Sequence, residues 1–216
     1  MKKINGGLFI VFEGGEGTGK STQSKILHNF LTKQGFETVL TREPGGTVGA
    51  EEIRDLLLFG EAERWDETTE ALLYLAARAN HWNRKISPLL NEGKIVISDR
   101  FHESSVVYQG FCRGVDIDFL NSIFQYITKN KMPDRIYLIM VEPKIGVARS
   151  LARDGNQETR FENMDIDFHK KVHEGFQKIY EKNKERFLYI DGSQTVQQIS
   201  DIIIKDIVSQ YPQLNS

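Results

Sequence analysis

One short glycine-rich run limits the folds open to this chain more than any other feature. Residues 14–21 satisfy the pattern G-x-x-x-x-G-K-[ST], with an apolar stretch before them, residues 8–12, and a helix-forming segment after them, about 20–34. Strand, loop and helix in this order form a phosphate-binding loop, in which backbone N–H groups and the helix N-terminus face phosphate oxygens. A merely flexible turn would not require these flanking segments. The run comprises Gly14, Gly15, Glu16, Gly17, Thr18, Gly19, Lys20 and Ser21, followed by Thr22.

The end of this loop carries the groups that handle a nucleoside triphosphate. In such a motif the lysine, here Lys20, reaches the β- and γ-phosphates, and the hydroxyl, here Ser21, is a ligand of magnesium. The sequence therefore predicts a site for ATP or a related nucleotide with Mg²⁺.

Short, continuously apolar runs recur along the chain at residues 8–12, 38–40, 95–97, 136–141 and 188–190. Runs without polar alternation are typical of strands covered on both faces, as in a parallel sheet. Helical segments alternate with them, at about 20–34, 48–59, 67–90, 118–129, 144–153, 166–186 and 195–209. We therefore expect an α/β fold of the P-loop NTPase type, with a doubly wound, five-stranded parallel sheet and helices on both faces. No repeat or linker divides residues 1–216, so we expect one domain.

Charge and composition exclude several classes of protein. The 216 residues include 28 Lys and Arg against 30 Asp and Glu, whereas a general binder of nucleic acid or of anionic membranes usually has a positive excess. We expect neither partner. No apolar run approaches the ~18 residues of a membrane span. A single cysteine, Cys112, allows no intramolecular disulfide, which suits a cytoplasmic protein.

The loop alone does not separate GTPases, ATPases and small-molecule kinases. A GTPase requires a D-x-x-G segment, and no Asp of this chain is followed by Gly three positions later. Motor and transport ATPases usually carry a larger apparatus than 216 residues hold. A nucleotide or metabolite kinase is the class that fits.

Three clusters beyond the loop are candidates for binding an acceptor. Arg42 follows the second apolar run, and Asp99 and Arg100 end the third, so all three are expected at the sheet edge where ligands bind in such folds. There the carboxylate can position magnesium and the guanidinium groups can hold phosphates. Tyr74 and Arg78 lie four apart on one helix face, an arrangement that suits stacking on a nucleobase and recognition of its edge. A solvated turn, a strand-terminal ion pair and a surface Tyr–Arg pair are the ordinary alternatives.

A fourth cluster is basic. Arg149 and Arg153 have i, i+4 spacing, and Arg160 follows a turn-rich stretch. The phosphate-binding loop contains acidic Glu16 and no basic residue before Lys20, so a further cation for the transferred phosphate must come from elsewhere. A closing segment with arginines would supply it and exclude water, and we expect a mobile lid at about 146–162. A solvated basic helix face is the alternative.

Taken together, these landmarks resemble the thymidylate kinase family over nearly the whole chain. Their order and spacing carry the resemblance. They are residues 13–22, Thr41-Arg42-Glu43-Pro44-Gly45-Gly46-Thr47, Ala76-Ala77-Arg78, Asp99-Arg100-Phe101, Tyr108-Gln109-Gly110 and Arg160-Phe161-Glu162. The resemblance implies Mg²⁺-dependent transfer of the ATP γ-phosphoryl group to dTMP, giving dTDP and ADP for dTTP biosynthesis.

The resemblance also implies roles for single residues at the phosphate end of the site. Glu16 corresponds to the acid that meets the deoxyribose 3′-hydroxyl, and Arg42 and Arg100 correspond to phosphate-binding arginines. Lys20, Glu16, Arg100 and Arg153 form the implied catalytic set, with Arg153 as the lid arginine of the bacterial type. Ser21 and Asp99 are the implied magnesium ligands.

At the nucleoside end, Tyr74 takes the place of an aromatic residue, commonly Phe, that stacks on thymine. Arg78 corresponds to the arginine that reads the thymine edge. Ser105 occupies a polar position that varies in the family. Tyr108 matches the tyrosine that crowds the ribose 2′ position, and Pro44 and Gln109 belong to the matching substrate-binding segments.

The lid departs from the family pattern. The family often has Asp-Arg-Phe-Glu there, whereas this chain has Thr159-Arg160-Phe161-Glu162, which leaves the lid role open among Arg149, Arg153 and Arg160. The resemblance also implies a homodimer. Two alternatives remain for function: a kinase for another nucleoside monophosphate or deoxynucleoside, and a P-loop module that binds nucleotide without turnover.

Overall fold

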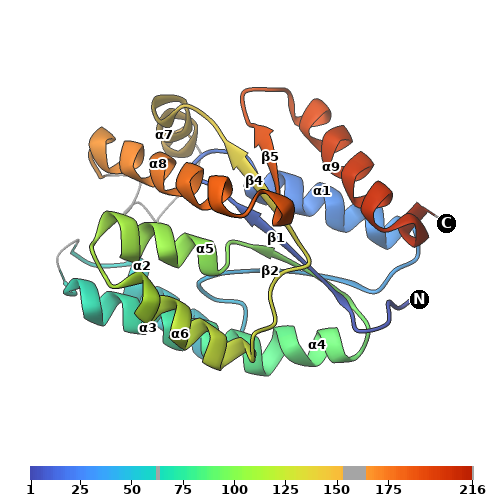
Figure 1. The fold of residues 1–216 in the computed structure, drawn as a ribbon, viewed down its shortest axis with the longest axis horizontal. Coiled ribbons are helices and arrows are strands. Elements are labelled where there is room, and N and C mark those ends of the chain that lie inside the picture. The colour runs from blue at the N-terminus through green and yellow to red at the C-terminus, as the bar shows by residue number, and fades with distance from the viewer. Residues whose placement is uncertain (62–63, 153–163, 216) are drawn as a thin grey trace.

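A five-stranded parallel sheet forms the centre of the protein (Figure 1), and its strand order is β2-β3-β1-β4-β5. The computed structural model describes residues 1–61, 64–152 and 164–215. The strands are β1 (Leu8–Glu13), β2 (Thr38–Arg42), β3 (Ile95–Asp99), β4 (Arg135–Met140) and β5 (Phe187–Asp191), and each pairs in parallel with its neighbours. All five predicted strands and the predicted fold class are confirmed.

Helices cover both faces of the sheet. They are α1 (Lys20–Lys33), α2 (Val48–Leu58), α3 (Glu67–His81), α4 (Ser87–Asn91), α5 (His102–Ser105), α6 (Ile117–Thr128), α7 (Pro143–Leu151), α8 (Ile166–Lys182) and α9 (Val196–Gln210). Two π-helical turns, η1 (Trp82–Ile86) and η2 (Val106–Cys112), and two short 3₁₀ turns, η3 (Lys184–Arg186) and η4 (Pro212–Asn215), complete the described elements. In Figure 1, α1 lies with α9, while α3, α4 and α6 lie together on the other side of the strands.

The central strand shows why the apolar runs lack alternation. Leu8, Ile10 and Phe12 of β1 pack in one core cluster with residues of α1 and α9. Phe9 and Val11 point the other way, into a cluster with residues of η1, α6 and α8. Because successive side chains of a strand face opposite sides, a strand covered on both faces must be apolar at every position.

Chain order places the phosphate-binding loop at the centre of this sheet. β1 lies between β3 and β4, so the chain leaves β1 toward one side of the sheet and later fills the other. In open α/β sheets, ligands bind outside the carboxyl ends of the strands at such a switch point. The loop that follows β1 therefore occupies the position where this fold binds ligands.

Two helical details differ from the sequence-based prediction. The helix expected over 67–90 is divided into α3, η1 and α4, with Pro88 at the start of α4. The second difference is a helical segment, α5 with η2, that the sequence analysis did not predict. Within the described ranges, no helix is both long and apolar enough to cross a membrane.

Candidate active site

The phosphate-binding loop joins β1 to α1, as its motif requires. Lys20, the first residue of α1, is 6% exposed, and its Nζ donates to the carbonyl oxygen of Gly15 at 2.6 Å. Gly17 has φ 63°, and a Cβ there would lie 1.9 Å from the carbonyl oxygen of Gly146 in α7. The Gly146 position is equally tight, since a Cβ there would lie 2.5 Å from the carbonyl oxygen of Glu16. Only glycines allow this crossing of loop and helix backbones.

Burial changes the protonation of the loop lysine. Desolvation, followed by the positive charge of Arg100, lowers the pKa of Lys20 to about 8, while Glu16 and Asp99 act in the opposite direction. A desolvated ammonium without a phosphate partner is disfavoured, so the site is electrostatically prepared for an anion.

The two predicted magnesium ligands lie together. The Ser21 hydroxyl donates to Asp99 Oδ2 at 2.5 Å, although the residues are 78 positions apart. Ser21 lies in the first turn of α1, and Asp99 ends β3, which pairs with β1. The parallel register brings both oxygens to the same sheet edge.

Arg100 connects the loop to the segment after β3. Its φ is 71°, a left-handed conformation that strains a residue with a side chain. Its Nη1 donates to Gly14 O at 3.0 Å and to Ser104 Oγ at 3.1 Å, and its Nη2 donates to Glu16 Oε1 at 2.6 Å. Burial opposes the charge, but Glu16 and Tyr108 raise the pKa of Arg100 well above its usual value. The guanidinium is thus a fixed positive charge beside the loop.

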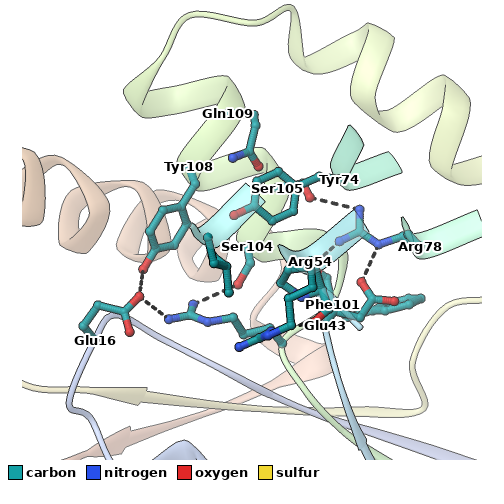
Figure 2. A pocket seen from close by; sticks show the side chains of 13 residues that line it. Glu16, Glu43, Arg54, Tyr74, Arg78, Phe101, Ser104, Ser105, Tyr108 and Gln109 are labelled. Carbon is teal, nitrogen blue, oxygen red and sulfur yellow. Dashed lines mark hydrogen bonds and ion pairs between the residues drawn. The ribbon is translucent and has the colours of Figure 1, made fainter. Parts of the chain in front are cut away.

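Tyr108 contacts both Arg100 and the Glu16 oxygen that Arg100 binds. The Tyr108 hydroxyl donates to Glu16 Oε1 at 3.0 Å, and the Arg100 guanidinium lies 5.2 Å from the centre of the Tyr108 ring. Burial and the neighbouring Glu16 carboxylate raise the pKa of Tyr108 well above 10, so its hydroxyl remains a donor. Figure 2 shows the Glu16–Tyr108 contact at one end of a pocket.

We call this hollow the inner pocket. It is lined by Glu16, Glu43, Pro44, Arg54, Leu58, Tyr74, Arg78, Arg100, Phe101, Ser104, Ser105, Tyr108 and Gln109. A second hollow, the loop pocket, is lined by residues 16–22 with Arg42, Glu43, Arg54, Asp99, Arg100 and Arg149. Four residues, Glu16, Glu43, Arg54 and Arg100, line both, so the two pockets adjoin.

Arg78 is held rigidly at the far end of the inner pocket. It is 2% exposed and donates from Nε to Glu43 Oε2 at 2.7 Å, from Nη1 to Ser105 Oγ at 3.0 Å and from Nη2 to Phe101 O at 2.8 Å. Burial acts to raise the pKa of Glu43, but Arg78 and His81 overcome it and lower that pKa. Tyr74, one turn before Arg78 on α3, lines the same pocket, as the spacing of the pair predicts.

Most predicted site residues are therefore brought together by the fold, in two groups. Lys20, Ser21, Thr22, Arg42 and Asp99 line the loop pocket, although Arg42 is half exposed and ion-paired with Glu51 at 3.0 Å. The predicted nucleoside-binding residues line the inner pocket. Arg153 and Arg160 lie outside the described residues, whereas Arg149 of α7 lines the loop pocket and donates to Gly192 O at 2.8 Å.

Sequence reasoning missed two pocket residues with clear positions. Arg54 lines both pockets and donates to Pro44 O at 2.5 Å. Ser104 donates to Glu13 Oε2 at 2.6 Å and accepts from Arg100. Arg54 had a usable signal, since it is a basic residue on the helix directly after the Arg42 segment.

Three further residues gain no ligand role. His169 and His173 have the i, i+4 spacing that a metal site can use, but the sequence offers no third ligand and predicts a solvated helix face for them. That prediction is wrong for His169, which is 5% exposed. Among the described residues, no group of three or more His, Cys, Asp or Glu residues could hold a metal. Burial raises the pKa of the Cys112 thiol to about 11, so it stays protonated, as expected of an unreactive cysteine.

Comparison with known proteins decides the family. The family model described as thymidylate kinase matches residues 12–203. The chain belongs to the thymidylate kinase family. A thymidylate kinase of Bacillus velezensis is 42% identical over 200 residues, covering 93% of this chain and 92% of the relative. Another, of Shouchella clausii, is 41% identical and covers 96% of each.

The structure agrees with the sequence comparison. The crystal structure of thymidylate kinase from Ehrlichia chaffeensis superimposes with a TM-score of 0.77 at 30% identity, covering 93% of this chain and 98% of that one. Membership in the thymidylate kinase family makes the chain a phosphotransferase that uses ATP. The predicted family and enzyme class are confirmed, and a non-catalytic binding module is not favoured.

Proposed function

We propose that this chain transfers the γ-phosphoryl group of ATP to dTMP, giving dTDP and ADP, in the biosynthesis of dTTP. One observation carries the proposal: the loop pocket and the inner pocket share four residues, of which Arg54 and Arg100 are cationic and Glu16 and Glu43 acidic. A triphosphate on the phosphate-binding loop and a monophosphate in the inner pocket would thus meet at two guanidinium groups. Both relatives described above are named thymidylate kinase, which agrees with this reaction.

Positioning and charge neutralisation account for catalysis. The acceptor is a phosphate oxygen, which is already anionic, so the reaction needs no strong general base. Lys20 holds the β- and γ-phosphates, and Arg100, fixed by Gly14 and Glu16, faces the phosphate that is transferred. Their charges stabilise the negative charge that spreads over the transferred group.

The sugar is recognised by Glu16 and Tyr108. The carboxylate of Glu16 accepts a hydrogen bond from the deoxyribose 3′-hydroxyl. The Tyr108 ring, 7% exposed, occupies the space that a 2′-hydroxyl would need. The hydrogen bond between the two side chains fixes both at once.

The base is recognised at the other end of the inner pocket. Tyr74 stacks on the pyrimidine ring, and Pro44 and Ser105 line the pocket around it. Arg78 donates to a base carbonyl with N–H groups that its bonds to Glu43, Ser105 and Phe101 do not use. Because those bonds fix the guanidinium plane, this donor is aimed before the substrate arrives.

The residues at the sheet edge fit magnesium. Mg²⁺ prefers oxygen ligands, and it is usually bound by one or two protein groups together with substrate phosphates. The Ser21 hydroxyl and the Asp99 carboxylate form such a pair beside the loop. When bound there with ATP, the ion neutralises charge on the phosphate oxygens.

We further propose that residues 1–216 form one kinase domain with a lid region at about 146–162. Arg153 is the proposed catalytic arginine of that lid, and Arg149 lies at its base, against the loop pocket. Loss of Arg153 should lower kcat more than it raises KM, since a lid cation acts in the transition state. The opposite pattern would make Arg153 a ground-state binder.

A homodimer in the cytoplasm completes the proposal. Apolar side chains on α2, α3 and α6, namely Leu56, Leu72, Phe119 and Tyr126, are 39%, 49%, 37% and 85% exposed. Because α3 packs against both α2 and α6, these side chains lie on neighbouring helices, where a partner subunit would cover them together. Light scattering at micromolar concentration tests it, and a monomer would reject it.

ADP release with Mg²⁺ and ATP tests the reaction. The acceptors to compare are dTMP, dUMP, dCMP, dGMP, dAMP and thymidine. We expect the highest kcat/KM with dTMP. A preference for another acceptor would retain the phosphate chemistry but reject the roles of Tyr74, Arg78 and Tyr108. An absence of ADP release with every acceptor would reject the proposed activity.

A further inference from the structure

The amide of Gln109 is held from behind by a buried acid. Gln109 Nε2 donates to Glu70 Oε1 at 3.0 Å, between η2 and α3. Gln109 is 1% exposed and Glu70 is fully buried. Figure 2 shows Gln109 reaching from its helix toward the other side chains of the inner pocket. Glu70 itself does not line that pocket.

The chemistry of the two partners sets the orientation of the amide. A carboxylate has no hydrogen to donate, so it can face only the NH₂ group of Gln109. The amide oxygen is then the atom that remains for the pocket. Arg113 Nε lies 3.3 Å from Glu70 Oε1 and supplies a counter-charge to this buried acid.

The oriented amide gives the pocket a fixed arrangement of hydrogen-bond donors and acceptors. Arg78 presents donors, and Gln109 Oε1 presents an acceptor. Thymine and uracil offer the complement, a carbonyl oxygen at position 4 and an N–H at position 3. Cytosine offers the reverse, an amino group and a bare ring nitrogen, so its lone pair would face the Gln109 oxygen.

We propose that Glu70 is a positioning residue: it fixes the Gln109 amide and thereby makes the inner pocket select a pyrimidine with a protonated N3 over cytosine. The inference rests on the proposed function, which places the base in the inner pocket that Gln109 lines. Glu70 does not touch the substrate, and it does not separate dTMP from dUMP, which share this edge.

Replacing the acid by its amide tests the proposal. In Glu70→Gln, residue 70 can donate as well as accept, so the Gln109 amide can turn and present its NH₂ group. We expect kcat/KM for dTMP and dUMP to fall together by about tenfold, and the dTMP-to-dCMP ratio to fall by more than that. Glu67→Gln is the matched control, since it makes the same change on an exposed residue of α3, and it should leave all three values unchanged.

A structural role alone would give a different result. If Glu70→Gln lowers kcat/KM for the three acceptors equally, with the dTMP-to-dCMP ratio unchanged, the inference is wrong. Glu70→Asp keeps an obligate acceptor, and we expect it to preserve a ratio within about threefold of the wild type. A collapsed ratio in Glu70→Asp would also reject the inference, and this variant serves if Glu70→Gln fails to fold. If the wild-type protein does not phosphorylate dTMP, that result would instead reject the proposed function.

Discussion

The protonation of Lys20 should appear directly in the pH dependence of catalysis. With a pKa of about 8, about nine-tenths of Lys20 carries its proton at pH 7 and about one-tenth at pH 9. Only the protonated form attracts the β- and γ-phosphates. We therefore expect kcat/KM for ATP to fall about tenfold from pH 7 to pH 9, because kcat/KM reports the free enzyme. A profile measured from pH 6.5 to 9.5, at a fixed dTMP concentration well below its KM, provides the check.

Two neighbouring charges allow the cause to be tested. Arg100 lowers the pKa of Lys20 and Glu16 raises it. Arg100→Met should move the alkaline limb to higher pH, and Glu16→Gln should move it to lower pH, whatever each change does to the maximum rate. Lys20→Ala, which should keep the fold but lose most turnover, is the reference for the residual rate.

Binding should also take up protons. ATP phosphates favour the charged lysine, so at pH 8.5, where about three-quarters of free Lys20 is neutral, binding should take up about 0.8 proton. Calorimetry in two buffers of different ionisation enthalpy measures this number. A flat rate profile up to pH 9.5, together with no proton uptake, would refute the account of a desolvated lysine.

Three other predictions concern the sugar, the acceptor phosphate and acid stability. Tyr108→Ala should accept the ribonucleotide counterpart of dTMP, whereas Tyr108→Phe should keep the preference for dTMP, because the ring itself blocks the 2′ position. An unchanged preference for dTMP over the ribonucleotide in the alanine variant would reject this. Arg54→Ala should raise KM for dTMP about tenfold, as expected for a lost charged contact, and an unchanged KM would place Arg54 outside the site. His102 has its pKa lowered to about 3 by burial, so the unfolded chain binds its proton first as pH falls below 6.5, and the folded state loses stability between pH 6.5 and pH 3. The free energy of unfolding of His102→Gln, measured by urea unfolding, should therefore rise by about 2 kcal/mol relative to that of the wild type between pH 8 and pH 5. An equal difference between the two proteins at both pH values would contradict this.

The sheet was predictable because its physical cause is visible in the sequence. Strands covered on both faces must be apolar throughout, and the glycine loop fixes which strand is central. The Tyr74–Arg78 pair was predictable for a similar reason, since a helix puts residues four apart on one face.

The segment from His102 to Cys112 was not predictable in this way. It begins as an α-helix and continues as a π-helical turn that carries Tyr108 and Gln109. A change of hydrogen-bond register from i+4 to i+5 leaves no compositional signature, although such turns are frequent at functional sites. The sequence could identify Tyr108 by family resemblance but not the backbone that aims it.

Contacts between distant residues were equally hidden. Glu43 holds Arg78 and His81 from positions 35 and 38 residues away, and Gln109 meets Glu70 across 39 residues. Nothing local marks these pairs, because each depends on how the strands and helices are assembled. The residues that orient the site are therefore less predictable than those that line it.

The crossing of Gly17 and Gly146 has a thermodynamic consequence. The two backbones touch without side chains between them, so the phosphate-binding loop and the start of α7 cannot shift independently. A ligand that orders the loop then also orders α7, and by linkage any contact that fixes α7 must strengthen phosphate binding by the same factor. Affinity for ATP is in this sense a property of two segments that lie more than 120 residues apart in the chain.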